Sequence, residues 1–135
     1  MTPDPQQGKR IFKKLLRVAP ELRQTTEYAK SRVAGFMDLN LDVLVRRSGW
    51  ARIALSHYWK DDSGDLIADP DMELAVSFDD ETAVALTYQD MFTYDDVYPV
   101  DGGPADIGVQ QQLNEFIEQW LDNLAEQGHV LPKGR

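Results

Sequence analysis

The chain has 135 residues and no cysteine, so it can form one domain with an ordinary core but has neither a disulfide framework nor a thiolate metal site. Residues 1–48 carry ten Lys or Arg against five Asp or Glu, whereas residues 49–135 carry four against eighteen, within a net charge of −9. The acidic part should repel nucleic acid, and no apolar run is long enough for a membrane span. We therefore expect no nucleic-acid or membrane partner and a cytoplasmic location, which the lack of cysteine and of an N-terminal targeting pattern favours.

The N-terminal part is predicted to hold one basic helix. Residues 1–8 are rich in Pro and Gln, which is typical of a disordered N-terminus. Residues 9–19 place apolar side chains at helical spacing with five cations between them, so they predict a basic amphipathic helix. Pro20 either ends this helix or opens a second short one through residues 21–23, and residues 25–34 show no clear period. We expect the basic helix to dock on its own acidic domain, because that buries its apolar side chains.

Alternating apolar and polar residues predict the first two strands of an antiparallel sheet. Residues 37–46 form the first, with an inward set of Met37, Leu39, Leu41, Val43 and Val45. A three-residue turn, 48–50, leads into the second strand, 50–58, whose inward set is Ile53, Leu55, His57 and Trp59. With this turn, Leu41 lies opposite His57.

Two or three further strands are predicted after the acidic loop at residues 60–65 and a second break at Asp69-Pro70. Residues 72–78 alternate clearly and form the third strand. The fourth strand, 83–89, can take either of two orientations. A plain turn before it buries Ala83, Ala85 and Thr87, whereas one bulge buries Val84, Leu86 and Tyr88. We favour the bulge because it buries the larger side chains. Residues 91–98 are a candidate fifth strand.

A long C-terminal helix completes the predicted fold. Residues 108–127 carry one continuous apolar stripe, with Asp106 as the N-terminal cap and Gly128 as the stop. The sequence predicts a single α+β domain over residues 9–129, an antiparallel meander of four to five strands flanked by the basic N-terminal helix and the long C-terminal helix. Residues 130–135 are expected to be a frayed tail.

Several stretches resemble a bacterial family of uncharacterised proteins, a domain of unknown function. They are GFMDLNLDVL (35–44), ALSHYW (54–59), GDLIADPDMEL (64–74), LTYQDMF (86–92) and WLDNLAEQGH (120–129). The resemblance covers nearly the whole domain and implies a small bacterial cytosolic protein. It implies no activity, cofactor or site.

Candidate chemistry is therefore limited to residue type and spacing. His57, Asp69, Asp71 and Asp90 are the grouping that resembles a metal or acid/base site, since imidazole and carboxylates suit Zn, Mn or Fe. The alternation sets His57 on a different face from Asp71, which favours a buried, hydrogen-bonded histidine over a ligand. A pair of His57 and Asp90 is the version that an enzyme would use.

Two other patterns favour ordinary structure. Asp61, Asp62 and Asp65 lack the ligand spacing of a calcium loop, so we interpret them as a solvated turn and expect no metal and no cofactor. No serine stands in a nucleophile context.

The aromatic residues point to binding. Tyr58, Trp59, Tyr88, Phe92 and Tyr94 are expected near one end of the sheet, where those left exposed beside acidic neighbours would suit a peptide or cationic partner. The leading hypothesis is a non-enzymatic binding or adaptor protein, chaperone-like, with a protein or peptide partner or as a homodimer. The alternative is a metal- or acid/base-dependent enzyme that uses His57 and Asp90.

Overall fold

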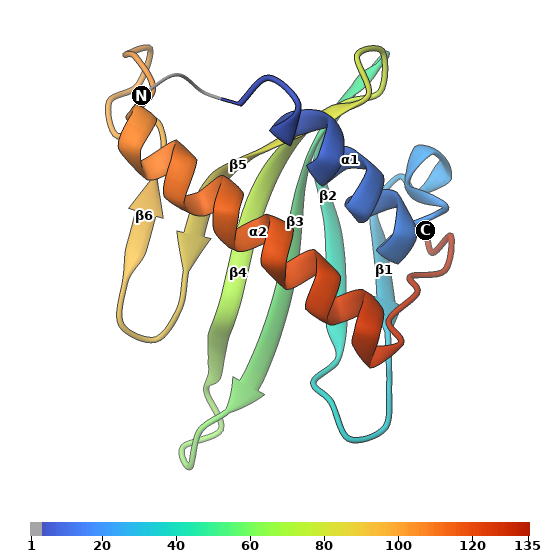
Figure 1. Cartoon of the computed structure of the whole chain (residues 1–135). Helices are drawn as coiled ribbons and strands as arrows, with labels where there is room; N and C mark the ends of the chain where they lie inside the picture. Colours follow the sequence, from blue (N-terminus) through green and yellow to red (C-terminus); the bar gives the residue numbers. More distant parts are fainter. Residues whose placement is uncertain (1–3) are drawn as a thin grey trace.

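The structure is a computed structural model in which residues 4–135 are described (Figure 1). In chain order, the elements are α1 (Gln7–Val18), the 3₁₀ turn η1 (Leu22–Gln24), β1 (Tyr28–Ser31), β2 (Leu39–Arg47), β3 (Trp50–Lys60), β4 (Leu66–Ser77), β5 (Thr82–Gln89), β6 (Tyr94–Asp96) and α2 (Ile107–Gln127). The predicted α+β class with a helix at each end is confirmed.

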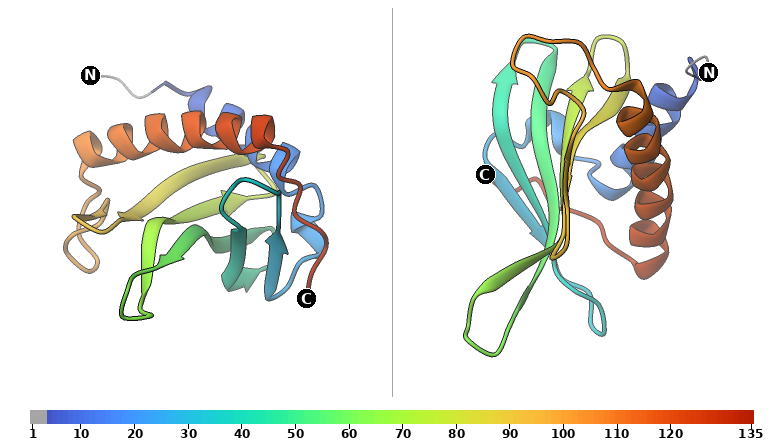
Figure 2. Two further views of the ribbon diagram at one scale, coloured as in Figure 1. Left: turned by 90° about the horizontal axis from the view of Figure 1, so that it is seen from below. Right: turned by 90° about the vertical axis from the view of Figure 1, so that its left-hand side faces the viewer.

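All six strands form one antiparallel meander in sequence order. Both helices cover the same face of this sheet, and residues 4–135 place no helix on the other face (Figures 1 and 2). The sheet has one strand more than predicted, because β1 lies in the stretch without a clear period. Its four residues place only Ala29 and Ser31 inward, too few to show a period. Among the described residues, no helix is long and apolar enough to cross a membrane.

Helix α1 is docked on the domain, as predicted. Its apolar side chains enter the core, among them Ile11, Phe12 and Leu15. On its polar side, Arg10 and Lys14 form ion pairs with acidic residues of α2. Burial of the apolar stripe is the larger contribution, since ion pairs near the surface are weak.

The ordered chain begins earlier than predicted. Of the residues expected to be disordered, 1–3 lie outside the described part of the chain. Helix α1 already begins at Gln7, because the Asp4 carboxylate and carbonyl accept hydrogen bonds from the N–H groups of Gln6 and Gln7, at 2.9 and 3.1 Å.

The predicted facing of β2 is correct in its first half and wrong in its second. A β-bulge at Leu44 lets Val45 pair with Arg52 on the uncovered face and turns Arg46 toward the helices. There the Arg46 guanidinium donates to three carbonyls around η1, those of Leu22, Arg23 and Thr25. These hydrogen bonds explain why a cation occupies a position where the alternation predicted valine.

The predicted pairing of Leu41 with His57 is also wrong. The turn before β3 has two residues, since Arg47 pairs with Trp50, and together with the bulge this shifts Leu41 to a position opposite Leu55. A shift of two residues conserves the face, so Leu41 and Leu55 remain inward and fully buried.

Strands β4 and β5 correct two further predictions. Strand β4 continues through Asp69-Pro70 without a break. Its pairing with β3 changes register between Ser56 and Tyr58. In β5 the facing switches within the strand: Ala85 lies opposite Leu74, whereas Tyr88 lies opposite Met72. Both predicted facings are therefore half correct, because the bulge is in mid-strand rather than in the turn.

Helix α2 has the predicted ends, but the residues after it are not frayed. Asp106 accepts a hydrogen bond from the Val109 N–H at 3.1 Å, and Gly128 adopts the left-handed conformation that ends the helix. Beyond it, Leu131 is buried, and Arg135 and Tyr28 exchange backbone hydrogen bonds along the free edge of β1. The C-terminal segment thus covers part of an edge that would otherwise be unpaired.

Candidate interaction surfaces on the uncovered face and end of the sheet

The face of the sheet that no helix covers carries polar side chains in two rows that cross all six strands. The strand pairing aligns the first row as Tyr28, Asp42, Ala54, Glu73, Thr87 and Asp96. It aligns the second as Lys30, Asn40, Ser56, Asp71, Gln89 and Tyr94. Residues that are directly opposite on neighbouring strands share a face. The two rows therefore form one continuous acidic surface.

Two short hydrogen bonds organise the centre of this surface. The Tyr58 hydroxyl donates to the Asp71 carboxylate at 2.5 Å, and the Arg52 guanidinium donates to Glu73 at 2.6 Å. Burial, and then the hydrogen bond to Asp71, raise the pKa of Tyr58 to about 12. Burial and the negative charge of Asp71 raise the pKa of Asp42 above its usual range. Asp42 and Asp71 thus interact unfavourably as like charges.

A second candidate surface lies beyond this face, where the β3–β4 hairpin meets the β5–β6 loop. Trp59, Asp69, Asp90, Met91 and Phe92 line a hollow of about 200 Å³, which we name the Trp59 hollow. Phe92 is 86% exposed, and Met91 and Trp59 are also exposed. Large apolar side chains that remain this exposed beside a concavity are typical of interaction sites.

The loop that presents Met91 and Phe92 is held by Asp90. Its carboxylate accepts hydrogen bonds from the Tyr88 hydroxyl at 2.6 Å and from the N–H groups of Phe92 and Thr93 at 2.8 and 2.9 Å. The bond from Tyr88, followed by that from Phe92, lowers the pKa of Asp90. Asp90 is therefore an ionised group that shapes the loop.

The structure does not bring the predicted pair of His57 and Asp90 together. Strand β4 lies between β3 and the end of β5, and two strand spacings correspond to about 10 Å. His57 is buried, its Nδ1 lies 2.8 Å from the Asp38 carbonyl oxygen, and its ring contacts that of Trp120. This is the hydrogen-bonded core histidine that the alternation favoured.

The five predicted aromatic residues lie in three places. Trp59 and Phe92 share the Trp59 hollow, whereas Tyr58 and Tyr94 lie on the uncovered face. Tyr88 lies toward the helices and packs edge-on against Phe116, with ring centroids 5.2 Å apart. The division follows from the register shifts in β4 and β5, which a period of two cannot reveal.

The acidic hairpin tip forms the turn that its spacing favoured. The Asp61 carboxylate accepts hydrogen bonds from the backbone N–H groups of Ser63 and Asp65 at 2.9 and 3.0 Å. These bonds stabilise the turn itself. Within residues 4–135, no group of three or more His, Asp or Glu side chains is arranged to hold a metal ion.

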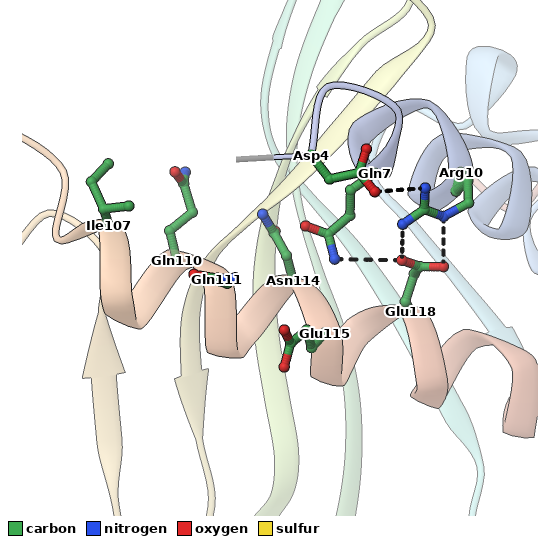
Figure 3. A pocket seen from close by; sticks show the side chains of 9 residues that line it. All are labelled: Asp4, Gln7, Arg10, Ile107, Gln110, Gln111, Asn114, Glu115 and Glu118. Atoms are coloured by element: carbon green, nitrogen blue, oxygen red, sulfur yellow. Dashed lines mark hydrogen bonds and ion pairs between the residues drawn. The ribbon is translucent and has the colours of Figure 1, made fainter. Parts of the chain in front are cut away.

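The cleft between α1 and α2 is another concavity, of about 330 Å³ (Figure 3). The Arg10 guanidinium forms a two-pronged contact with Glu118 on its wall, at 3.0 and 3.2 Å, and also pairs with Asp4. The Asn114 side-chain oxygen accepts a hydrogen bond from the Ala85 N–H at 2.8 Å. Arg10 and Glu118 thus already pair with each other across the two helices, and Asp4 is paired with Arg10.

Sequence reasoning missed most residues at the centre of the uncovered face, and it named Asp71 only in a grouping with His57, Asp69 and Asp90. Asn40, Asp42, Ser56 and Asp71 occupy the outward positions of three strands, which are usually plain solvent-facing residues. The alternation in the sequence did show that these residues point outward on each strand. Only the register, which depends on two bulges, shows that they are neighbours.

Comparison with known proteins gives one result that identifies a family. No curated protein and no solved structure matches the chain. A family model covers residues 10–130, which include most of helix α1, all of helix α2, all six strands and every residue of the two candidate surfaces. The chain belongs to this family, which is described as Domain of unknown function (DUF6908).

Proposed function

We propose that the chain is a non-enzymatic binding protein whose Trp59 hollow takes a basic segment of a protein partner that carries an apolar side chain. The observation that supports this most is the exposure of Phe92, at 86%, beside Met91 and Trp59. Exposed aromatic and methionine side chains that cluster at a concave site are typical of the centres of protein interfaces.

The charge of the hollow favours a basic partner. Asp69 and Asp90 line it, and no Lys or Arg is among its lining residues. The part of the chain that follows residue 48 has a large excess of acidic residues. A cationic segment therefore gains long-range attraction as it approaches, in addition to the apolar contact. A hollow of about 200 Å³ holds one apolar side chain, with cations placed at its rim.

Titration with a defined peptide tests the proposal. The probe is a fluorescein-labelled peptide of alternating Lys and Leu, and its anisotropy is followed at neutral pH and low salt. Phe92→Ser should weaken binding by about tenfold or more, because it removes an aromatic anchor. Asp69→Asn should weaken binding less and should reduce its dependence on salt. Leu44→Ser is the matched control, since Leu44 is 48% exposed on another strand.

Three results would contradict the proposal. One is binding that Phe92→Ser does not change, and another is equal binding of a peptide with Glu in place of Lys. The third is self-association of the wild type that Phe92→Ser abolishes in sedimentation experiments, which would assign the hollow to a second copy of this chain.

A further inference from the structure

At the centre of the uncovered sheet face, two small side chains lie between larger ones on the neighbouring strands. Ala54 and Ser56 of β3 are only 7% and 1% exposed, although no helix covers this face (Figure 2). Taller side chains on the neighbouring strands must shield them. These taller side chains, the walls, are Asn40 and Asp42 on β2 and Asp71 and Glu73 on β4, and with the two small residues, the floor, we name them the β3 trough. The backbones of β2 and β4 lie about 10 Å apart, at about 4.8 Å for each strand spacing.

The floor of the β3 trough carries a hydroxyl group without a hydrogen bond. Ser56 Oγ is buried and has no hydrogen-bond partner among the described residues. The Ser56 side chain opposes the rise in the pKa of Tyr58, so the two hydroxyl groups are close, and Tyr58 donates its own proton to Asp71. A buried hydroxyl without a partner destabilises the folded state, so it requires an explanation such as a ligand.

The walls of the trough carry negative charge that the protein does not neutralise. Arg52 is paired with Glu73, and no ion pair in residues 4–135 reaches Asp42 or Asp71. Lys30 and Lys60 border an adjoining hollow of about 440 Å³ that Asp42 also lines, and neither forms an ion pair with it. The like charges of Asp42 and Asp71 disfavour one another. A positive group placed above Ser56 would relieve that repulsion.

We propose that the β3 trough binds an organic cation, a primary ammonium or guanidinium group, with Asp42 and Asp71 as its charge partners and Ser56 Oγ as a further hydrogen-bond acceptor. Both cations present several N–H donors, which match two carboxylates and a hydroxyl oxygen. A metal ion fits less well, since no group of three metal-binding side chains occurs in the described part of the chain. The β3 trough shares no residue with the Trp59 hollow, so this inference is independent of the proposed function.

Two probes test the site and distinguish the source of the cation. One is 1,4-diaminobutane, a free amine, and the other is the blocked tripeptide acetyl-Ala-Arg-Ala-amide, whose only charge is a side-chain guanidinium. Each is titrated at neutral pH and low salt, with binding followed by calorimetry and by amide chemical shifts in ¹⁵N-labelled protein. We expect saturable binding, with the largest shifts at residues 42, 56 and 71.

Matched variants assign that binding to the trough. Asp42→Asn and Asp71→Asn, which conserve size, should each weaken binding about tenfold, because charge-assisted hydrogen bonds are the strong ones. Ser56→Ala should weaken it about threefold to tenfold. Asp96→Asn, at the edge of the same face, and Phe92→Ser should leave it unchanged. Thermal unfolding of each variant confirms that it is folded, and the three trough variants provide independent readings.

Binding of both probes, or of either one alone, with these losses supports the site. Tripeptide binding alone assigns the cation to a protein side chain, and diamine binding alone assigns it to a small amine. Absence of saturable binding of both probes overturns the inference. So does binding that none of Asp42→Asn, Asp71→Asn and Ser56→Ala changes.

Discussion

The two faces of the sheet are built from alternating residues of the same strands, yet they are organised differently. Toward the helices, Leu41, Leu55 and Met72 lie side by side with no exposed surface, and α1 and α2 cover them. On the opposite face, their sequence neighbours Asp42, Ser56 and Asp71 lie in a trough without a covering element.

This difference separates what stabilises the fold from what is available for binding. The stabilisation from burying apolar side chains scales with the area that is removed from water, so the helix-covered face contributes most of the stability. The uncovered face holds an unpaired hydroxyl and two carboxylates that repel each other. Groups that weaken the folded state where they lie are expected at functional sites. This contrast supports the cation site that we propose on the face that contributes less to stability.

The largest expected effect comes from two adjacent residues that point to opposite faces. Leu55→Ala should lower the free energy of unfolding by about 2–5 kcal/mol, because it leaves a cavity between Leu41 and Met72. Ser56→Ala should leave stability unchanged or raise it by up to about 1 kcal/mol, because it removes a hydroxyl that has no partner. Urea unfolding followed by circular dichroism measures both. Equal losses in the two variants would contradict the difference between the faces.

The next effect concerns a buried polar group on the helix side. Asn114→Ala should cost about 1–3 kcal/mol, because it leaves the Ala85 N–H without its acceptor. Asn123→Ala is the matched control on the same helix. There the lost bond, from the Gln119 side chain at 3.1 Å, is exposed and should contribute less than about 0.5 kcal/mol. Similar losses in both variants would show that solvent replaces the Asn114 bond.

Periodicity in the sequence was sufficient to predict most helices and strands of this fold, but not the register in which the strands pair. Strands β2 to β5 and helix α2 carry long repeats of period 2 or 3.6 that local sequence determines. Strand β1 was missed because it has only four residues, and its edge is completed by Arg135 from the other end of the chain. The contact between Tyr28 and Arg135 is set by the tertiary structure, so no local pattern encodes it.

The candidate surfaces were less predictable for the same reason. Trp59 and Phe92 could be named because large aromatic residues near acidic loops are visible in sequence. The neighbourhood of Asp42, Ser56 and Asp71 depends on one bulge in the pairing of β2 with β3 and one in the pairing of β3 with β4. A bulge adds one residue with little change in composition, and alternation alone does not show where it lies.

The two histidines of the chain give a smaller, pH-dependent effect on the helix-covered side. His129 is buried, its Nδ1 lies 2.9 Å from Ser31 Oγ, and its ring centroid is 6.0 Å from that of His57. Burial, and then the charge of His57, lower the pKa of His129, while a hydrogen bond with the Met37 backbone and then the charge of Asp38 oppose this.

The lowered pKa of His129 determines whether stability rises or falls with pH. The unfolded chain binds this proton below about pH 6.5 while the folded protein resists it, so stability is lost as pH falls below that value. The free energy of unfolding should therefore decrease from about pH 7.5 to about pH 5.5, and less steeply in His129→Gln. Urea unfolding at a series of pH values measures both slopes. Identical slopes would contradict a neutral, buried His129.

The smallest expected effect concerns the ionic contact that joins α1 to α2. Glu118 accepts hydrogen bonds from Arg10 at 3.0 and 3.2 Å and from Lys14 at 2.9 Å. The bonds from Arg10, followed by those from Lys14, lower the pKa of Glu118 to about 2. In the unfolded chain the value is about 4.3, so the stabilising contribution is complete above that pH and is lost as pH falls toward 2.

Solvent limits the size of that contribution, since Arg10 is 44% exposed. We expect Glu118→Gln to cost less than about 1 kcal/mol at neutral pH, less still in high salt, and almost nothing near pH 2. Unfolding measured across this pH range should show the wild type and Glu118→Gln converging. Hydrogen exchange of Ile11 to Leu15 should remain slow in Glu118→Gln, because these side chains stay buried whatever the ionic contact does. Fast exchange there would mean that α1 is held by its charges rather than by its apolar face, and the helix-covered side would then be less stable than its burial implies.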